Sequence, residues 1–131
     1  MEIWKDVVWY EGLYKVSNLG NVKSLDMILP YQRYSKPAKR FRKGKMLTPA
    51  KMANGYLRVE MSNNGKHKLN LVHRLVAMAF IPNANNYNEI NHINCDKTDN
   101  RVENLEWCSS SYNKKHALKN KLYKNENLYC S

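Results

Sequence analysis

The strongest constraint on the fold of this chain is a pattern over residues 87–122. A strand-like stretch at 87–92 ends in histidine, a polar loop follows at 94–100, and a second apolar stretch at 105–108 contains tryptophan. Serines then offer N-cap oxygens for a helix. A strand, loop, strand and helix in this order can bring asparagine and histidine side chains around one divalent metal ion.

Two upstream segments are predicted to be β-hairpins. Residues 14–17 and 22–25 alternate in polarity on either side of a turn, and residues 56–61 and 66–71 flank an Asn-Asn-Gly sequence. Asn-Gly is the turn chemistry of a tight strand reversal. The N-terminal half is therefore expected to consist of small antiparallel hairpins.

The next segment changes to a helical period. Residues 72–80 place their apolar side chains on one helical face, and a proline ends the helix soon after. His73 and Arg74 lie off that face. The plain interpretation of His73 is an ordinary histidine at the surface or the core edge, and a phosphate contact is the alternative for both residues. The fold class is thus α+β.

The chain is strongly basic, with a formal net charge of +11 and an isoelectric point near 9.6. No Asp or Glu occurs in residues 27–59, where Lys and Arg are frequent. A field of one sign attracts a polyanion, although a solvated basic loop is the alternative. Prolines predict a loop or poorly ordered arm over residues 31–46. Together with the pattern at 87–122, the charge favours nucleic acid as the partner.

The three cysteines show no Cys-x-x-Cys spacing, so a zinc knuckle is not supported. A structural zinc site from His92, Cys95, Cys108 and His116 stays a weak alternative, because this cysteine spacing is unusual for zinc. The N-terminus does not resemble a signal peptide, and the longest apolar run is too short to span a bilayer. We expect an intracellular protein, in the cytoplasm of a bacterium or phage-infected host, that is not secreted and has no membrane partner.

The polar residues of the 87–122 pattern can carry out phosphodiester hydrolysis. A neutral histidine such as His92 can take a proton from water near neutral pH. An asparagine such as Asn104 can fix the tautomer of that imidazole. Amide oxygens from Asn91 and Asn113 are hard ligands that suit Mg²⁺ or Mn²⁺. Because these ligands are neutral, we expect metal binding to be coupled to DNA binding.

Each of these residues also has a simpler interpretation. Asparagine is common in turns and caps, and taken singly Asn91 or Asn113 fits such a role. His116 is three residues beyond Asn113 and shares its helical face, but its charge alone favours the second half of a helix. The order of the residues along the chain supports the joint interpretation.

The residues that carry a family resemblance fall into two groups. Residues 72–83, Asn91-His92, residues 99–107 and residues 113–117 resemble the HNH endonucleases of phage and mobile-intron origin. Residues 4–24 resemble the nuclease-associated modular motif that precedes this domain in homing endonucleases. The resemblance covers residues 2–26 and 54–117, in the expected order.

The resemblance implies a ββα-metal (His-Me finger) fold for residues 87–122. It implies that His92 is the general base, that Asn104 braces it, and that Asn91 and Asn113 hold one metal ion, with His116 as a second candidate on the helix. It also implies that the N-terminal strands approach the DNA. The predicted DNA contacts are Lys15, Lys23, Arg33, Lys36, Lys39, Arg40, Arg42, Lys43, Lys45, Arg58, His73 and Arg74.

The chain departs from the family pattern at several positions. Asn91 stands where relatives often carry His or Asp, and Cys95 stands at the usual glycine position of the loop, where Asn94 is expected to absorb a left-handed conformation. Few residues follow the predicted helix, so no helix-turn-helix is expected there. Sequence specificity is then low, comes from the basic arm, or requires a dimer.

We therefore expect a region 1–53 with β hairpins and a basic arm, and a nuclease region 54–125. The predicted function is a Mg²⁺- or Mn²⁺-dependent endonuclease, one ion per site, that nicks or cuts double-stranded DNA as a monomer or homodimer. The alternative is a non-catalytic DNA-binding module derived from the same architecture.

Overall fold

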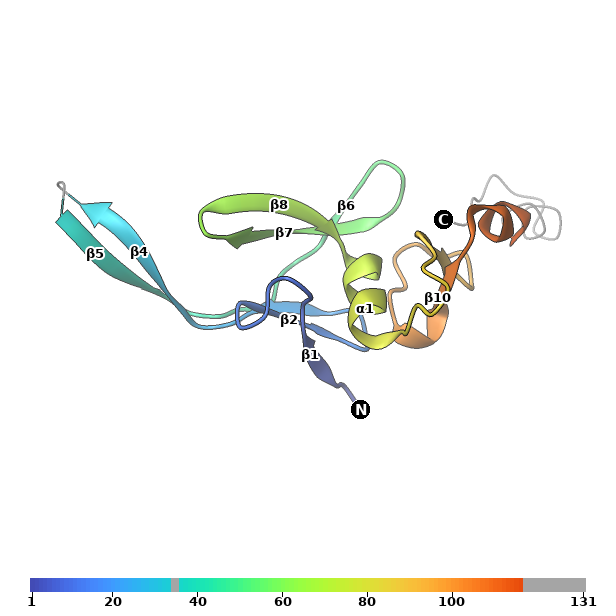
Figure 1. The fold of residues 1–131 in the computed structure, drawn as a ribbon, viewed down its shortest axis with the longest axis horizontal. Coiled ribbons are helices and arrows are strands. Elements are labelled where there is room, and N and C mark those ends of the chain that lie inside the picture. The colour runs from blue at the N-terminus through green and yellow to red at the C-terminus, as the bar shows by residue number, and fades with distance from the viewer. Residues whose placement is uncertain (34–35, 117–131) are drawn as a thin grey trace.

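The computed structural model describes residues 1–33 and 36–116, apart from the side chains of residues 29–38. Figure 1 shows an elongated arrangement of this part of the chain. A β-ribbon extends at one end, short strands and helix α1 form the middle, and a C-terminal hairpin and helix lie at the other end. The predicted α+β class is confirmed.

The N-terminal sheet contains three antiparallel strands in sequence order: β1 (Trp4–Asp6), β2 (Tyr14–Ser17) and β3 (Val22–Ser24). Tyr14 and Val16 point into the core, whereas the intervening Lys15 pairs with Lys23 on the opposite face. This alternation is the period of a strand with one buried side. The predicted first hairpin is confirmed.

A second sheet also has three antiparallel strands in sequence order: β6 (Ala50–Lys51), β7 (Leu57–Asn63) and β8 (Lys66–Leu71). Asn63 pairs with Lys66 across the turn, and both central residues have positive φ, 53° at Asn64 and 76° at Gly65. These values are typical of a type I′ turn, which Asn-Gly favours. The second predicted hairpin is confirmed.

The basic stretch is a two-stranded ribbon, which corrects the prediction of a loop or poorly ordered arm. Strands β4 (Met27–Arg33) and β5 (Lys36–Arg42) pair antiparallel and project from the rest of the molecule (Figure 1). Pro30 pairs with Lys39 and Pro37 with Gln32. Each strand of an isolated ribbon has a free edge, where a proline without an N–H removes no ladder bond.

Helix α1 (Val72–Phe80) directly follows β8 and contacts the N-terminal sheet, β7 and the C-terminal strands. Val72, Leu75 and Val76 are buried, as the helical period predicted. His73 is also buried, at 6% exposure, although it was expected off the buried face. The reason is that C-terminal strands pack on α1 as well, so that more than one of its faces is covered.

The C-terminal part forms the predicted strand, loop, strand and helix. Strand β9 (Glu89–His92) pairs antiparallel with β10 (Leu105–Cys108), a 3₁₀ turn (Val102–Asn104) leads into β10, and residues 110–116 are helical. Trp107 is half-buried, and its indole N–H donates to the carbonyl of Ile81 at 3.0 Å. The predicted extension of the helix to about residue 122 lies outside the described residues.

The hydrophobic core is continuous across the predicted boundary at residue 53. One buried cluster contains Val7 and Val16 from one side and Met61, Val76 and Ile90 from the other. The two predicted regions share this core, and their boundary stays a prediction. None of the helices in the described ranges is long and apolar enough to cross a membrane.

Candidate active site

The ladder between β9 and β10 positions the first two residues of the site. Leu105 pairs with His92 and Glu106 pairs with Asn91. Successive strand residues point to opposite faces, so Asn91 and His92 project to different sides of the hairpin. Both side chains are fully buried, at 0% exposure. Burial of a polar group costs free energy unless the group is hydrogen-bonded, so the partners of these two side chains indicate their roles.

His92 is held through its Nε2 atom. This nitrogen lies 2.8 Å from Oδ1 of Asn100, and because an amide oxygen can only accept, Nε2 donates its proton there. In this neutral tautomer Nδ1 is the nitrogen without a proton. Burial lowers the pKa of His92, while the Asn100 bond and the nearby carboxylates of Asp96 and Asp99 oppose that shift. A net lowered pKa keeps the imidazole neutral at pH 7.

Two further rings pack beside His92. The ring centroids of His73 and His92 are 5.0 Å apart, and Tyr56 stacks on His73 at 5.0 Å with an interplanar angle of 23°. The Nδ1 atom of His73 is buried without a hydrogen-bond partner. Burial, with smaller contributions from His92 and Arg74, lowers the pKa of His73 to about 3. His73 is therefore a neutral neighbour of His92 inside the site.

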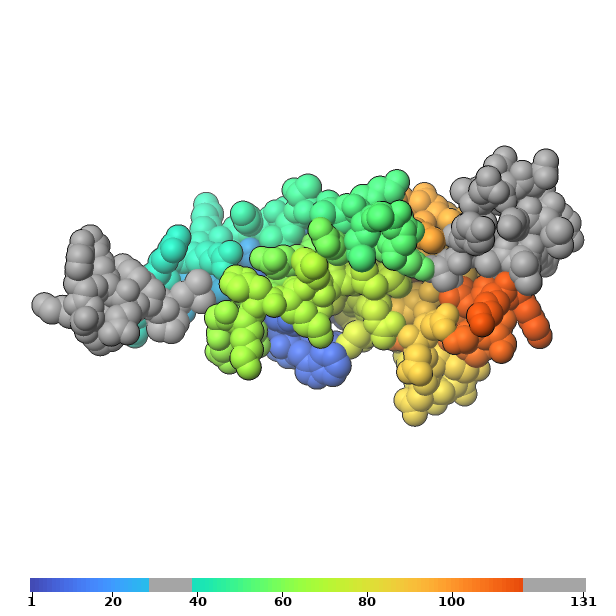
Figure 2. Space-filling view, turned by 90° about the horizontal axis from the view of Figure 1, so that it is seen from above, coloured from blue at the N-terminus to red at the C-terminus, as the bar shows by residue number. Residues whose placement is uncertain are grey.

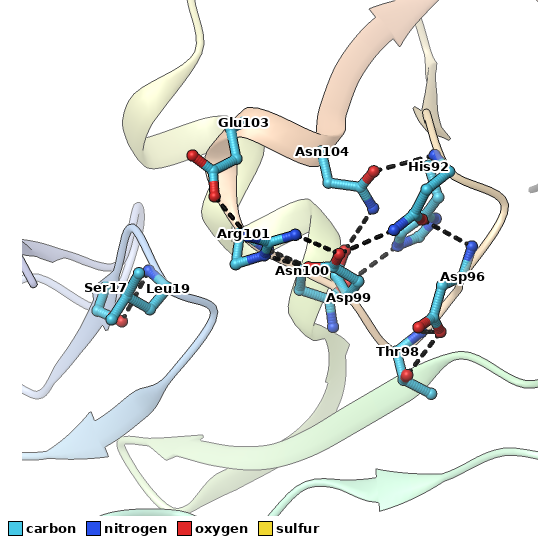
Figure 3. A network of polar contacts seen from close by, with 11 residues as sticks. Ser17, Leu19, His92, Asp96, Thr98, Asp99, Asn100, Arg101, Glu103 and Asn104 are labelled. Atoms are coloured by element: carbon cyan, nitrogen blue, oxygen red, sulfur yellow. Dashed lines mark hydrogen bonds and ion pairs between the residues drawn. The ribbon is translucent and has the colours of Figure 1, made fainter.

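Asn104 braces the loop that leads from β9 to β10. Its Oδ1 accepts the backbone N–H of Asn94 at 3.0 Å, and its Nδ2 donates to the carbonyl of Asp99 at 2.8 Å. Figure 3 shows these contacts beside His92. The sequence predicted Asn104 as the brace of the imidazole. The structure places Asn104 across the loop and Asn100 on the ring nitrogen.

The same loop is stabilised by local polar contacts (Figure 3). Arg101 donates to both carboxylate oxygens of Asp99 at 2.8 Å, which lowers the pKa of Asp99 to about 2. Asp96 accepts from the hydroxyl and N–H of Thr98. The left-handed residue is Cys95 itself, with φ of 66°, and not Asn94 as predicted. Here Asn94 caps the turn instead, since its Oδ1 accepts the N–H of Asp96.

The amide oxygens of Asn91 and Asn113 are the clearest candidates for metal ligands. Both oxygens are buried and have no hydrogen-bond partner, although few buried polar atoms in proteins are left in this state. Each amide nitrogen is occupied: Asn91 donates to Glu106 at 2.9 Å and Asn113 donates to Glu89 at 3.0 Å. Buried, unpaired oxygens of hard amide ligands fit a divalent cation such as Mg²⁺ or Mn²⁺.

Two other candidate metal ligands, His116 of the predicted metal site and Cys108 of the zinc alternative, have surroundings unlike those of the two asparagines. The His116 ring stacks on Tyr112 with centroids 6.2 Å apart. Burial raises the pKa of the Cys108 thiol to about 11, which keeps it protonated. Within residues 1–33 and 36–116, no group of three or more His, Cys, Asp or Glu side chains is arranged to hold a metal ion. The zinc alternative gains no support from this part of the chain.

Most of the predicted DNA contacts on the ribbon and the segment after it are exposed: Lys39, Arg40, Arg42, Lys43 and Lys45. Arg33 and Lys36 lie on β4 and β5, where side chains are not described. In Figure 2 the described part of this segment, coloured teal to green, runs along one side of the molecule. Exposed cations that lie close together along the chain suit contact with a polyanion.

The other predicted contacts are less accessible. Lys15 and Arg58 are half-buried, as is Lys23, whose ammonium lies 4.2 Å from the ring centroid of Trp4. Arg74 donates to the carbonyl of Asn88 at 2.9 Å and lies over Trp107, so it helps to fix the start of β9. Buried His73 lies against His92, which does not favour the predicted phosphate contact.

The N-terminal sheet also touches the site. The turn between β2 and β3 contacts the loop that carries Asn100, because the N–H of Val102 donates to the carbonyl of Asn18 at 2.9 Å. A Cβ added at Gly20 would lie 3.1 Å from the carbonyl oxygen of Asn100. Figure 3 shows this turn, marked by Ser17 and Leu19, on one side of the network. The residue that holds His92 is thus packed against the N-terminal motif.

Comparison with known families gives two matches. The model of the NUMOD4 motif matches residues 2–62, and a model described as HNH endonuclease matches residues 70–115. The first extends beyond the predicted boundary at residue 53. The second contains His73, Asn91, His92, Asn100, Asn104 and Asn113.

Individual relatives agree with these matches. Two uncharacterized HNH endonucleases of Acanthamoeba polyphaga mimivirus, L245 and L247, are 45% identical over 60% of this chain and 37% identical over 92% of it. The DNA endonuclease I-HmuI of Bacillus phage SP01 is 31% identical over 88% of this chain. The chain spans 24%, 27% and 57% of the lengths of these three relatives, respectively.

A solved structure is also similar. It describes DNA binding and cleavage by the HNH homing endonuclease I-HmuI, and it matches with a TM-score of 0.66 and 30% sequence identity. The match covers 94% of this chain and 59% of that one. The fold similarity therefore includes both the N-terminal motif and the C-terminal hairpin.

Proposed function

Because the chain carries a NUMOD4 motif at residues 2–62 and an HNH endonuclease domain at residues 70–115, we propose that it is a divalent-metal-dependent DNA endonuclease. One observation carries this proposal: two buried asparagine oxygens without partners, in Asn91 and Asn113, come from the same small hairpin and helix as the buried, neutral His92. The proposed substrate is double-stranded DNA, which is nicked or cut in both strands.

The residues have separate tasks in this proposal. Asn91 and Asn113 hold Mg²⁺ or Mn²⁺, one ion per site, with His116 as a further candidate. When bound, the ion supplies positive charge for the scissile phosphate and the departing oxygen. His92 accepts the proton of the attacking water at Nδ1, while Asn100 keeps Nε2 protonated. Asn104 holds the loop that carries Asn100.

DNA is proposed to bind along the ribbon side of the molecule. The exposed cations from Lys39 to Lys45 supply phosphate contacts, which make binding steeply dependent on salt. The proposed assembly on the DNA is a monomer or a homodimer. The proposed place of action is inside the cell, in the cytoplasm of a bacterium or of a phage-infected host.

A supercoiled plasmid assay tests this function. The parent protein with Mg²⁺ or Mn²⁺ is expected to relax or linearise the plasmid, and chelation of the metal should stop the reaction. His92→Ala should bind DNA with unchanged affinity but cut at least about 10²-fold more slowly, which is the usual contribution of a general base. Equal cutting by His92→Ala and the parent would show that His92 is not the base.

The second candidate function is a DNA-binding module without catalysis. The observation that favours it is the neutral residue at the first ligand position, Asn91, together with the left-handed Cys95 in the loop. The same assay separates the two functions. Retardation of DNA in a gel without nicking, across a series of divalent ions, would select the binding module.

A further inference from the structure

For the two candidate ligands, Asn91 and Asn113, the amide group alone does not determine which of its two ends faces the ion. An asparagine side chain presents an oxygen on one side and an NH₂ group on the other, and only the oxygen can bind a cation. A rotation of the amide by half a turn would direct the NH₂ group at the ion. Some neighbouring group must therefore select the orientation of Asn91 and of Asn113.

For Asn91 that neighbour is Glu106. The two residues are directly paired across the β9–β10 ladder, so their side chains lie on the same face. The Oε1 atom of Glu106 accepts a hydrogen bond from Nδ2 of Asn91 at 2.9 Å. A carboxylate can only accept, so it fixes the nitrogen toward itself and leaves the buried oxygen facing away.

For Asn113 the neighbour is Glu89. Its Oε1 accepts from Nδ2 of Asn113 at 3.0 Å, and its other oxygen accepts from the hydroxyl of Ser110 on the same helix. A glutamate carboxyl is ionised at neutral pH, so an anion accepts both of these bonds. Glu89 is two residues before Asn91 on β9, and alternate strand residues share a face. One face of the hairpin therefore holds both carboxylates and the amide of Asn91.

This arrangement also changes the charge of the site. The ligand atoms are neutral, but each amide donates to a carboxylate directly behind it. An anionic acceptor polarises the amide and increases the negative charge on its oxygen, as outer-shell carboxylates do for histidine ligands of zinc. The two carboxylates also attract a divalent cation directly, because opposite charges attract through space.

We propose that Glu89 and Glu106 are positioning residues, which orient the amides of Asn113 and Asn91 so that their oxygens face a divalent cation and which supply the negative charge that these ligands lack. This inference rests on the proposed metal site. It predicts that Mn²⁺ binds measurably to the protein without DNA, in contrast to the expectation that neutral ligands would require the charge of DNA.

The test is a titration of full-length protein with Mn²⁺, followed by the electron paramagnetic resonance signal of free Mn²⁺. Glu106→Gln keeps a hydrogen-bond acceptor of the same size but removes the charge, and Glu106→Ala removes both. Affinity for Mn²⁺ should fall about 10-fold in the first variant and up to about 100-fold in the second, the range found for outer-shell partners of metal ligands. The corresponding Glu89 variants should behave in the same way.

Glu60→Gln is the matched control. Glu60 is exposed on β7 and lies 3.6 Å from His67, so its substitution makes the same change in net charge but leaves the hydrogen bonds of both asparagines in place. Mn²⁺ affinity should remain within about twofold of the parent value in this control. The double variant Asn91→Asp with Glu106→Gln moves the negative charge onto the ligand itself, and should recover most of the affinity lost by Glu106→Gln.

The outcomes separate this inference from the proposed function. Loss of Mn²⁺ binding in Asn91→Ala and Asn113→Ala, but parental binding in all four Glu variants, would overturn the inference and retain the metal site. Parental binding in the Asn variants would overturn the metal site and the inference together. If the Ala variants fail to fold by circular dichroism, the Gln variants decide, because they preserve volume and hydrogen bonding.

Discussion

At the scale of single residues, the site combines buried polar groups whose partners determine their chemistry. His92 is neutral because it is buried, and Asn100 determines which of its nitrogens carries the proton. His73 is forced to stay neutral beside it, with a pKa near 3. Protonation of His73 is disfavoured by burial and also by the charges of its neighbours His92 and Arg74, which would repel the protonated ring.

His73 is expected to make stability depend on pH. Its pKa is about 3 in the folded protein, below the ordinary value of 6.5, so the unfolded chain binds the proton more tightly. The stabilising effect is complete above pH 6.5 and is lost as the pH falls toward 3. The loss between pH 7 and 4.5 is on the order of 2 kcal/mol in the free energy of unfolding.

Urea unfolding of the parent and of His73→Phe at the two pH values measures this effect. Phenylalanine keeps a ring against Tyr56 but cannot bind a proton, so the variant should lose less stability on acidification. His67→Phe, at an exposed histidine on β8, serves as the control and should follow the parent. An equal pH dependence in the parent and His73→Phe would contradict the role assigned to His73.

At the scale of elements, the ribbon formed by β4 and β5 is the main difference from the sequence-based prediction. Its prolines and lack of carboxylates indicated a loop, yet the two strands pair along their whole length. Arg40 and Arg42 alternate along β5 and so share one face of the ribbon. A two-stranded ribbon has the width to enter the major groove of DNA.

Substitution of both arginines by glutamine should weaken DNA binding uniformly across DNA sequences. Each lost phosphate contact is expected to reduce the slope of log affinity against log salt by about 0.9. Affinities measured by fluorescence anisotropy at several salt concentrations give this slope. Lys5→Gln, which removes a cation from β1, should leave the slope unchanged, and an equal change in both proteins would rule out a specific role of the ribbon.

In the whole molecule, the residues that match the NUMOD4 motif and those that match the HNH endonuclease model form one structural unit. They share the buried cluster that contains Val16 and Val76, and the turn after β2 packs against the loop that carries Asn100. Two successive contacts therefore link the N-terminal turn to the proposed base. Gly20 packs against Asn100, and Asn100 is hydrogen-bonded to His92.

Gly20→Ala tests this connection, with Gly12→Ala as a matched control. Both glycines have positive φ, 89° and 79°, so each substitution should cost about 1–2 kcal/mol of stability from backbone strain. Only the Cβ at position 20 would press on Asn100, since nothing lies within 4 Å at position 12. Gly20→Ala alone should slow plasmid cleavage by about tenfold or more, as expected when a catalytic group is displaced.

Thermal unfolding of both variants separates the effect on stability from the effect on cleavage. Comparable losses in melting temperature with unequal cleavage rates are the expected result. Equal cleavage by the two variants at a temperature where both are folded would show that the N-terminal turn does not position Asn100.

Elements with local sequence signals could be predicted from the residues alone. The Asn64-Gly65 turn, the apolar face of α1 and the order of strand, loop, strand and helix around His92 follow from side-chain period and turn chemistry. These properties depend on residues that are near one another in the chain, so they are readable without the fold. The assignment of Asn91 and Asn113 as ligands remains a prediction that the unpaired oxygens support.

Which side chains meet in the site depends on contacts between distant parts of the chain. Nothing local pairs Asn91 with Glu106, because their contact depends on the register of β9 against β10. Likewise, Asn100 reaches His92 only through the path of the loop, and His73 is buried only because the C-terminal strands cover a second side of α1. Register, loop path and packing arise from contacts between distant residues, and these fixed the partners of each polar group in the site.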